Sequence, residues 1–202
     1  MKAILYLYIS LLVVFAACSS NQPKANKTFR IVENRSVVEW KGSAPTHFHK
    51  GTFQVTGSFE TNGEGNITSG QFVIPIASII NTDLPEPAKN ELINHLKSPD
   101  FFNLAQHPEA SFRINNVLYE GEQKPDSNQV TVVGDFSMIG QTHPINFIAS
   151  VIHEGDRISV EATFSINRLK WGMTSFSDPK AELYILPDVE LKLHIQAEKT
   201  MH

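Results

Sequence analysis

Apolar and polar residues alternate with a period of two along several stretches of the chain. The alternation is strict over residues 52–60, 157–167 and 188–198, where every second residue is apolar or glycine and its neighbours are polar. Successive side chains of a β-strand point to opposite faces of a sheet, so this pattern is typical of strands with one dry and one wet face. Each stretch is therefore predicted to be an antiparallel strand.

Six further segments are predicted to be strands on a less regular alternation: residues 29–33, 36–41, 70–76, 111–117, 130–138 and 145–152. Segments rich in glycine, asparagine and other turn-forming residues separate several of them, at residues 62–66, 120–128 and 154–156. About eight or nine antiparallel strands with one apolar face form either a closed barrel or a two-sheet sandwich. A barrel of about eight strands can be filled by side chains or can hold one small ligand.

One segment, residues 87–97, breaks the strand pattern. Leu92 and Leu96 lie four positions apart there, which gives a short helical apolar stripe. The residue before Pro99 avoids helical backbone angles, so the helix is predicted to end at that point. We expect this helix to cap the barrel across one end or one side.

The N-terminal segment differs in composition from the rest of the chain. Its apolar run of about 15 residues is short for the roughly 20 that a membrane-spanning helix needs. The run precedes Cys18, as in the signal peptide of a lipoprotein. Residues 1–17 are therefore predicted to be a cleaved signal peptide, Cys18 a lipidated residue, residues 18–27 a flexible tether and residues 28–199 one barrel domain.

Cys18 is the single cysteine of the sequence, so no disulfide bond can form within the chain. Two alternatives to lipidation stay open: an ordinary signal peptide cut elsewhere, and a free cysteine in a leftover leader. Ser19 after the cysteine resembles the pattern that sorts lipoproteins to the outer membrane. We expect the protein to be exported and held by an N-terminal lipid anchor at the periplasmic face of the outer membrane.

Charge and motifs exclude several function classes. The net charge is −4 and no basic cluster is present, which argues against a nucleic-acid partner. The chain lacks GxSxG, HExxH and Walker-type motifs, so we expect no enzymatic activity. His47 and His49 would share a strand face and could bind a metal, but nothing nearby supplies a third ligand, so no metal site is predicted.

From residue 95 onward the sequence contains, in order, HLKSPDFFN, HPEASFRINNV, VTVVGDFSMIGQTHPINF and FSINRLKWGM. In this order the motifs resemble the YceI-like family of bacterial periplasmic proteins, and the resemblance extends from VVEWKGS at Val37 to the last predicted strand. It implies an all-β fold, an antiparallel lipocalin-like β-barrel of about eight strands with one short capping helix. It also implies a polyisoprenoid chain held in an elongated apolar pocket, without enzymatic activity.

Many of the 13 phenylalanines occupy inward positions of predicted strands. Each one alone is explained by an ordinary core, and the resemblance is what favours a pocket for the set. The adjacent Phe101 and Phe102 are expected to be buried, either fixing the helix to the barrel or closing the pocket mouth. The predicted ligand-binding residues are Phe53, Val55, Phe59, Phe72, Ile74, Leu92, Leu96, Phe101, Phe102, Phe112, Phe136, Phe147, Phe164 and Trp171.

Arg168 ends an alternating strand and, with Asp178 and Lys180 in the following loop, is a candidate polar rim of the pocket. The alternative is a structural salt bridge or a hydrogen-bonded turn. The sequence predicts a protein that sequesters or transports an isoprenoid or quinone-like lipid and has no other cofactor. The rival prediction is an envelope interaction or stress-accessory module with a filled barrel and no lipid. A homodimer is left open.

Overall fold

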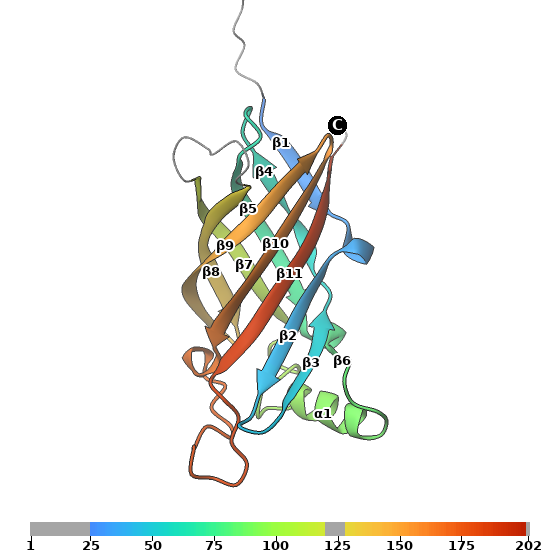
Figure 1. The fold of residues 1–202 in the computed structure, drawn as a ribbon, viewed down its shortest axis with the longest axis vertical. Coiled ribbons are helices and arrows are strands. Elements are labelled where there is room, and N and C mark those ends of the chain that lie inside the picture. The colour runs from blue at the N-terminus through green and yellow to red at the C-terminus, as the bar shows by residue number, and fades with distance from the viewer. Residues whose placement is uncertain (1–24, 120–127, 201–202) are drawn as a thin grey trace, which may run out of the picture.

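The computed structural model describes residues 25–119 and 128–200, in which the strands form a single antiparallel sheet (Figure 1). The strands are β1 (Lys27–Ile31), β2 (Val37–Ser43), β3 (Phe48–Phe53), β4 (Thr56–Thr61), β5 (Ile67–Pro75), β6 (Ile80–Asn81), β7 (Glu109–Tyr119), β8 (Gln129–Met138), β9 (Gln141–Glu154), β10 (Arg157–Asn167) and β11 (Asp188–Lys199). The helices are the α-helix α1 (Ala88–Lys97) and the short 3-10 helices η1 (Glu33–Arg35), η2 (Ile76–Ser78) and η3 (Arg168–Trp171).

The sheet closes into a barrel through β1. This strand pairs with β4 on one side, where Phe29 lies opposite Phe59, and with β11 on the other, where Ile31 lies opposite Ala197. The resulting ring has eight strands, β1, β4, β5, β7, β8, β9, β10 and β11. β2, β3 and β6 continue the wall at the lower end in Figure 1, beside the half of β11 that β1 leaves free. The predicted fold class, a closed all-β antiparallel barrel with one short helix, is confirmed.

Eight of the nine predicted strands correspond to one observed strand each, but residues 52–60 do not form a single strand. β3 ends at Phe53 and β4 begins at Thr56, because the two pieces pair with different neighbours: β3 with β2 and β6, and β4 with β1 and β5. At Gly57 the backbone has φ of 138°, where a Cβ would lie 2.2 Å from the Gln71 carbonyl oxygen. The period of two therefore continues through a break in the hydrogen-bonded ladder.

The two-residue strand β6 is not predicted by the sequence pattern. It pairs with β3, where Gly51 lies opposite Asn81. A Cβ on Gly51 would lie 1.8 Å from the Ile80 carbonyl oxygen, so the close approach of the two strands requires glycine. This pairing holds Asn81 and, two residues later, Asp83 against β3.

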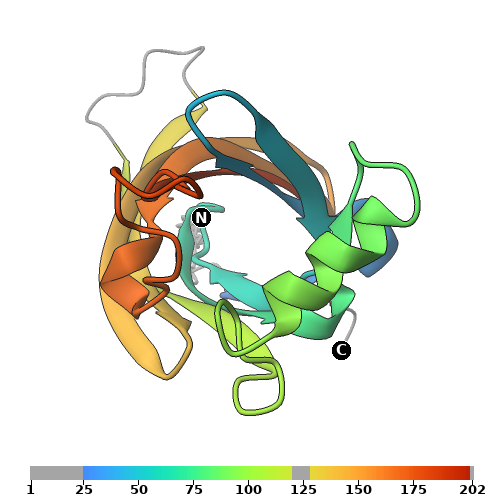
Figure 2. The ribbon, with the colours of Figure 1, turned by 90° about the horizontal axis from the view of Figure 1, so that it is seen from below.

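The hydrophobic core lies inside the ring, because the inward residues of each strand are the apolar ones. On β8, for example, alternate residues from Val130 to Met138 are buried. Seen from below in Figure 2, α1 and the segment of residues 172–187 lie at the lower end of the ring. Leu92 and Leu96 of α1 pack against the core, as predicted.

Several sequence predictions concern residues outside the described ranges. The predicted signal peptide, Cys18 and most of the tether lie there, as does most of the predicted turn at residues 120–128. In residues 25–119 and 128–200, the structure contains no helix with the length and apolar character to cross a membrane.

Candidate functional site: an apolar cavity inside the barrel

A cavity of about 270 Å³ lies inside the barrel. Its wall is built from inward side chains of strands all around the ring, together with side chains from α1 and from the segment that follows it. A cavity of only about 10–15 Å³ is enough to hold one water molecule, so the barrel is not filled by its own side chains. The interior therefore has room for a ligand, and the wall offers that ligand almost entirely apolar contacts.

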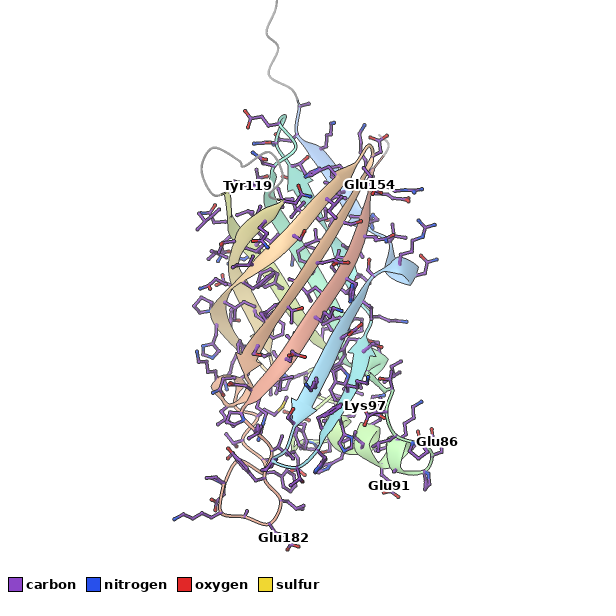
Figure 3. All side chains as sticks on the ribbon, viewed as in Figure 1. Glu86, Glu91, Lys97, Tyr119, Glu154 and Glu182 are labelled. Carbon is purple, nitrogen blue, oxygen red and sulfur yellow. The ribbon has the colours of Figure 1, made fainter. Side chains whose placement is uncertain are left out.

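The cavity extends along the barrel and opens at the end that is lower in Figure 1. The lining residues from the upper part of the strands, Ile67, Val151 and Ile195 among them, are all buried. Near them the Tyr119 hydroxyl accepts a hydrogen bond of 2.5 Å from the Ile67 amide, and Figure 3 shows Tyr119 at the upper end. At the lower end, by contrast, the exposed His47 belongs to the lining, so the cavity reaches the surface there.

The turn that follows the C-terminus of α1 places Phe101 and Phe102 at this lower opening. The Phe102 amide donates to the Leu96 carbonyl at 3.0 Å, and the chain then turns at Asn103, which has φ of 48°. Both rings line the cavity. Phe101 stacks on Phe176 with ring centres 6.1 Å apart, and Phe102 meets the edge of a β3 ring, Phe53, at 5.6 Å. The two phenylalanines therefore fix the helix to the barrel and also form part of the cavity wall.

Phenylalanines from four strands form a row along the cavity wall. Phe72 of β5 stacks on Phe112 of β7 at 6.3 Å, and Phe112 lies 5.7 Å from Phe147 of β9. Phe147 in turn stacks on Phe164 of β10 at 4.3 Å. Phe72, Phe112 and Phe164 are only half-buried although they point inward, because their free surface faces the cavity.

Thirteen of the fourteen residues that the sequence predicts as ligand-binding line this cavity. Their position on the wall is observed, whereas contact with a ligand stays a prediction. The exception is Trp171, which is 1% exposed and is not part of the lining. Trp171 is the last residue of η3. Its indole nitrogen donates to the Phe136 carbonyl at 3.1 Å, and its ring packs against the ring of Phe136 on β8. Trp171 is thus a wall support, and its assignment as a cavity residue is corrected.

Arg168 does not form the predicted polar rim, because its side chain is only 2% exposed. The guanidinium borders the cavity, yet all five of its N–H groups donate to backbone carbonyls of residues 173–186. Burial lowers the pKa of this guanidinium, and the nearby Tyr184 opposes that shift. Asp178 and Lys180 form an exposed turn, in which the Lys180 amide donates to Asp178. The hydrogen-bonded turn that the sequence left as the alternative is what the structure contains.

A polar cluster borders the opening on the β3 side. His49 Nδ1 lies 2.8 Å from Asp83 Oδ2, and the Lys50 amide and the Asn81 side chain donate to Asp83 Oδ1 at 2.8 and 2.7 Å. Burial raises the pKa of Asp83, but these hydrogen bonds and the charge of His49 together hold it below its ordinary value. In the described parts of the chain, no three His, Cys, Asp or Glu side chains are placed to hold a metal ion.

Sequence reasoning considered His47 and His49 only as metal ligands and missed two residues near them. Asp83 carries no periodic signal, because it follows the two-residue strand β6. Trp40 of β2 lines the cavity and is 7% exposed. Its indole nitrogen is buried without a hydrogen-bond partner in the described structure. The alternation of residues 36–41 indicates that Trp40 faces inward, but no local pattern indicates an unpaired N–H group.

A closed antiparallel barrel around an apolar cavity defines a class of protein, a barrel that can enclose a small apolar ligand. The sequence profile of the YceI-like domain matches residues 29–197, and the chain belongs to the YceI-like family. Protein YceI of Escherichia coli O6:H1 is 34% identical over 77 residues, which cover 38% of this chain and 37% of that relative's length. A UPF0312 protein of Pseudomonas putida is 32% identical over 146 residues, 67% of this chain and 70% of the relative.

Solved structures share the fold at low sequence identity. BcnA of Burkholderia cenocepacia superposes with a TM-score of 0.66 at 16% identity, covering 82% of this chain and 98% of that one. A polyisoprenoid binding domain from Saccharophagus degradans gives 0.63 at 14% identity, covering 85% and 98%. A Campylobacter jejuni YceI protein gives 0.54 at 20% identity, covering 67% and 75%. These similarities establish the barrel fold.

Proposed function

We propose that this protein binds an apolar isoprenoid-type lipid inside its barrel and sequesters or transports it in the bacterial periplasm. The observation that carries the proposal is the cavity of about 270 Å³ with an almost wholly apolar wall. One solved structure with the same fold is described as a polyisoprenoid binding domain, which supports the choice of ligand class. We propose a binding protein rather than an enzyme.

The hydrophobic effect makes such a cavity a favourable site for a chain lipid. Each methylene that leaves water contributes about 0.8 kcal/mol, so a long chain binds tightly without directed polar contacts. An empty apolar cavity is correspondingly unfavourable. At about 24 cal/mol per Å³, a cavity of 270 Å³ corresponds to roughly 6 kcal/mol of lost packing. Lipid that fills the cavity should therefore stabilise the folded barrel as well as shield the chain from water.

Native mass spectrometry tests the proposal directly. The full chain is expressed in a Gram-negative host that processes export signals, purified, and analysed before and after organic extraction. We expect a discrete added mass that extracts as a polyisoprenoid or a quinone. A bare protein that also fails to take up added isoprenoids would overturn the proposal and would favour an envelope interaction module.

The cellular location is a further part of the proposal. An N-terminal lipid on Cys18 would hold the barrel near a source of membrane lipids, which is where a lipid carrier needs to be. The Cys18→Ser variant is expected to move from the membrane fraction to the soluble fraction, because it loses the acyl chains. Ser19→Ala, which keeps the cysteine, is the matched control. If Cys18→Ser stays in the membranes, the anchor is wrong.

A homodimer stays a prediction, and sedimentation velocity of the lipid-loaded and lipid-free protein tests it.

The filled barrel that the interaction-module alternative requires disagrees with the cavity. The lipid-binding proposal is therefore the better supported of the two.

A further inference from the structure

The cavity wall carries few polar groups, and they gather near the lower opening. The polar side chains of the lining are Ser43, His47, His49 and Arg168, with the indole N–H of Trp40 in addition. Arg168 has no N–H left to donate, since backbone carbonyls accept from all five. The groups with capacity to contact the polar end of a ligand therefore lie on β2, β3 and the turn between them.

Trp40 holds an unused hydrogen-bond donor inside the barrel. Its indole nitrogen is buried, and none of the described residues accepts a hydrogen bond from it. A buried polar group without a partner costs about 1–3 kcal/mol, so native proteins rarely keep one without a reason. Trp40 belongs to the wall of a cavity that has room for a ligand. A ligand oxygen in that cavity would satisfy the donor.

The register of β2 and β3 brings Trp40 close to His49. Trp40 lies opposite Gly51 and Gly42 lies opposite His49, so the two side chains are diagonal neighbours on the inner face. The indole crosses over Gly51, where a Cβ would lie 2.8 Å from the ring atom Cζ2. Cζ2 is on the same edge of the indole as the N–H group. Gly51 is two residues from His49 on the same strand face, so the indole and the imidazole follow one another along the inner face of β3.

Asp83 fixes which nitrogen of His49 is an acceptor. The ionised carboxylate of Asp83 can only accept, so His49 Nδ1, 2.8 Å away, carries the proton that it donates. In the neutral imidazole the other nitrogen, Nε2, is then an acceptor, and no described residue donates to it. Besides Ser43 and the exposed His47, the lining near the lower opening thus offers a donor on Trp40 and an acceptor on His49, a pair that matches a single hydroxyl group.

The same groups disfavour an anionic head. Asp83 contributes a negative charge behind His49, and its carboxylate is already satisfied by three donors. Glu91 and Glu182 extend from the lower end of the molecule (Figure 3). Lys41 lies 5.0 Å above the Phe48 ring and is not part of the cavity lining. A phosphate would therefore enter without the guanidinium or ammonium donors that usually bind it.

We infer that Trp40 and His49, with Asp83 as a positioning residue, form a subsite for the uncharged hydroxyl head of the lipid. The Trp40 indole N–H donates to the hydroxyl oxygen, and the hydroxyl hydrogen is donated to His49 Nε2. This inference rests on the proposed lipid-binding function and adds the chemistry of the head group that the cavity selects.

Four probes with the same apolar chain separate the contributions: geranylgeraniol, its methyl ether, its monophosphate and the corresponding hydrocarbon. Affinities are measured near neutral pH with the full, delipidated chain by competition against labelled geranylgeraniol. For the unsubstituted protein we expect the alcohol to bind at least about tenfold tighter than the hydrocarbon, because the two hydrogen bonds outweigh the cost of taking the hydroxyl out of water, and the phosphate to bind more weakly than the alcohol.

Each variant has its own expected pattern. Trp40→Phe removes the donor, so the alcohol and the ether should both weaken by about tenfold. His49→Phe removes the acceptor, so the alcohol should weaken by a similar factor, whereas the ether, which has no hydrogen to donate, should not. Asp83→Asn should reduce the preference for the alcohol over the ether without changing the affinity for the ether. Retained binding of the hydrocarbon shows that each variant is folded.

The outcomes distinguish the two proposals. If the unsubstituted protein binds all four probes equally, or if the variants weaken every probe alike, the head-group subsite is wrong while lipid binding stands. Phosphate binding as tight as alcohol binding would also overturn the subsite. If no probe binds, the proposed function fails and the subsite fails with it.

Discussion

The upper and lower parts of the barrel are built on different principles. In the upper part, long strands such as β9 and β10 pair residue by residue, and the inward side chains are apolar and buried. At the lower end the wall is completed by short pieces: β6, α1, η3 and the segment of residues 172–187. The polar groups that border the cavity all lie at this lower end. The periodic strands thus form the wall of the cavity, and the irregular segments form its opening.

The side chains that hold the two regions together also differ. In the upper part, backbone ladders and apolar packing supply most of the contacts, and the hydrogen bond between the Tyr119 hydroxyl and the Ile67 amide adds to them. At the lower end, single buried side chains replace the missing ladder: Arg168 binds five carbonyl groups, and Trp171 binds the Phe136 carbonyl. Irregular backbone leaves some of its carbonyl groups without a ladder partner, and side chains supply donors to them. Substitutions of the buried side chains at the lower end should therefore affect stability differently from substitutions on the paired strands.

The largest effect is expected at Arg168. Arg168→Met keeps the length of the side chain but leaves buried carbonyls without a donor, so the free energy of unfolding should fall by about 3 kcal/mol or more. Arg157→Met, at an exposed position of neighbouring β10, should change it by less than about 1 kcal/mol. Urea denaturation measures both. Equal effects of the two substitutions would show that the carbonyl cluster does not hold the lower end.

The second effect concerns lipid rather than stability. Phe164→Trp enlarges a ring that faces the cavity and stacks on Phe147, so the protein should retain its fold and lose most of its bound lipid. Ile148→Trp, on the outer face of β9 where the side chain is 61% exposed, is the matched control and should leave the lipid content unchanged. Extraction followed by mass spectrometry gives the amount of lipid per protein. Unchanged lipid in Phe164→Trp would count against the cavity as the binding site.

The smallest effect is expected at Asp83 and depends on pH. Its pKa is lower in the native state than the value of 3.8 for the free side chain, so the unfolded chain takes up the proton at the higher pH. The stability from the ionised carboxylate is therefore present above about pH 4 and is lost as the pH falls through the native pKa. Asp83→Asn should be less stable than the unsubstituted protein at about pH 5, and this difference should shrink at about pH 2 to 3.

Unfolding titrations at both pH values test this dependence. Asp156→Asn is a suitable control, because Asp156 is 77% exposed and lies 3.5 Å from Lys199 at the surface. A stability difference between Asp83→Asn and the unsubstituted protein that is the same at both pH values would contradict the assigned role of the Asp83 hydrogen bonds.

The strand-rich part of the molecule was predictable from local patterns. Residues 157–167 and 188–198 match β10 and β11 almost residue for residue, because strict alternation reports the two faces of a barrel wall. The helix ends where Pro99 predicts it, with Ser98 as its C-cap. The same reasoning failed at residues 52–60, since a period of two says which face a side chain occupies but not which neighbour the backbone pairs with.

The site residues show the same contrast between what a local pattern predicts and what distant contacts decide. The inward phenylalanines were predictable as a set, whereas Trp171 was wrongly included in that set and Arg168 was assigned to the rim because it ends an alternating strand. The structure shows both to be engaged by backbone carbonyls instead. Asp83 reaches His49 from 34 positions along the chain, a distance over which no local pattern carries information.

The sequence by itself determined that the chain forms antiparallel strands, that one face of each strand is apolar and that a short helix ends just before Pro99. It determined these features because the period of the apolar residues and the conformational limits of proline act locally. The tertiary structure decided that the barrel is hollow, that it opens at the lower end, and that Asp83 reaches His49, the diagonal neighbour of Trp40. Cavities and unpaired donors arise from how distant segments pack, and packing is a property of the closed barrel rather than of any single segment.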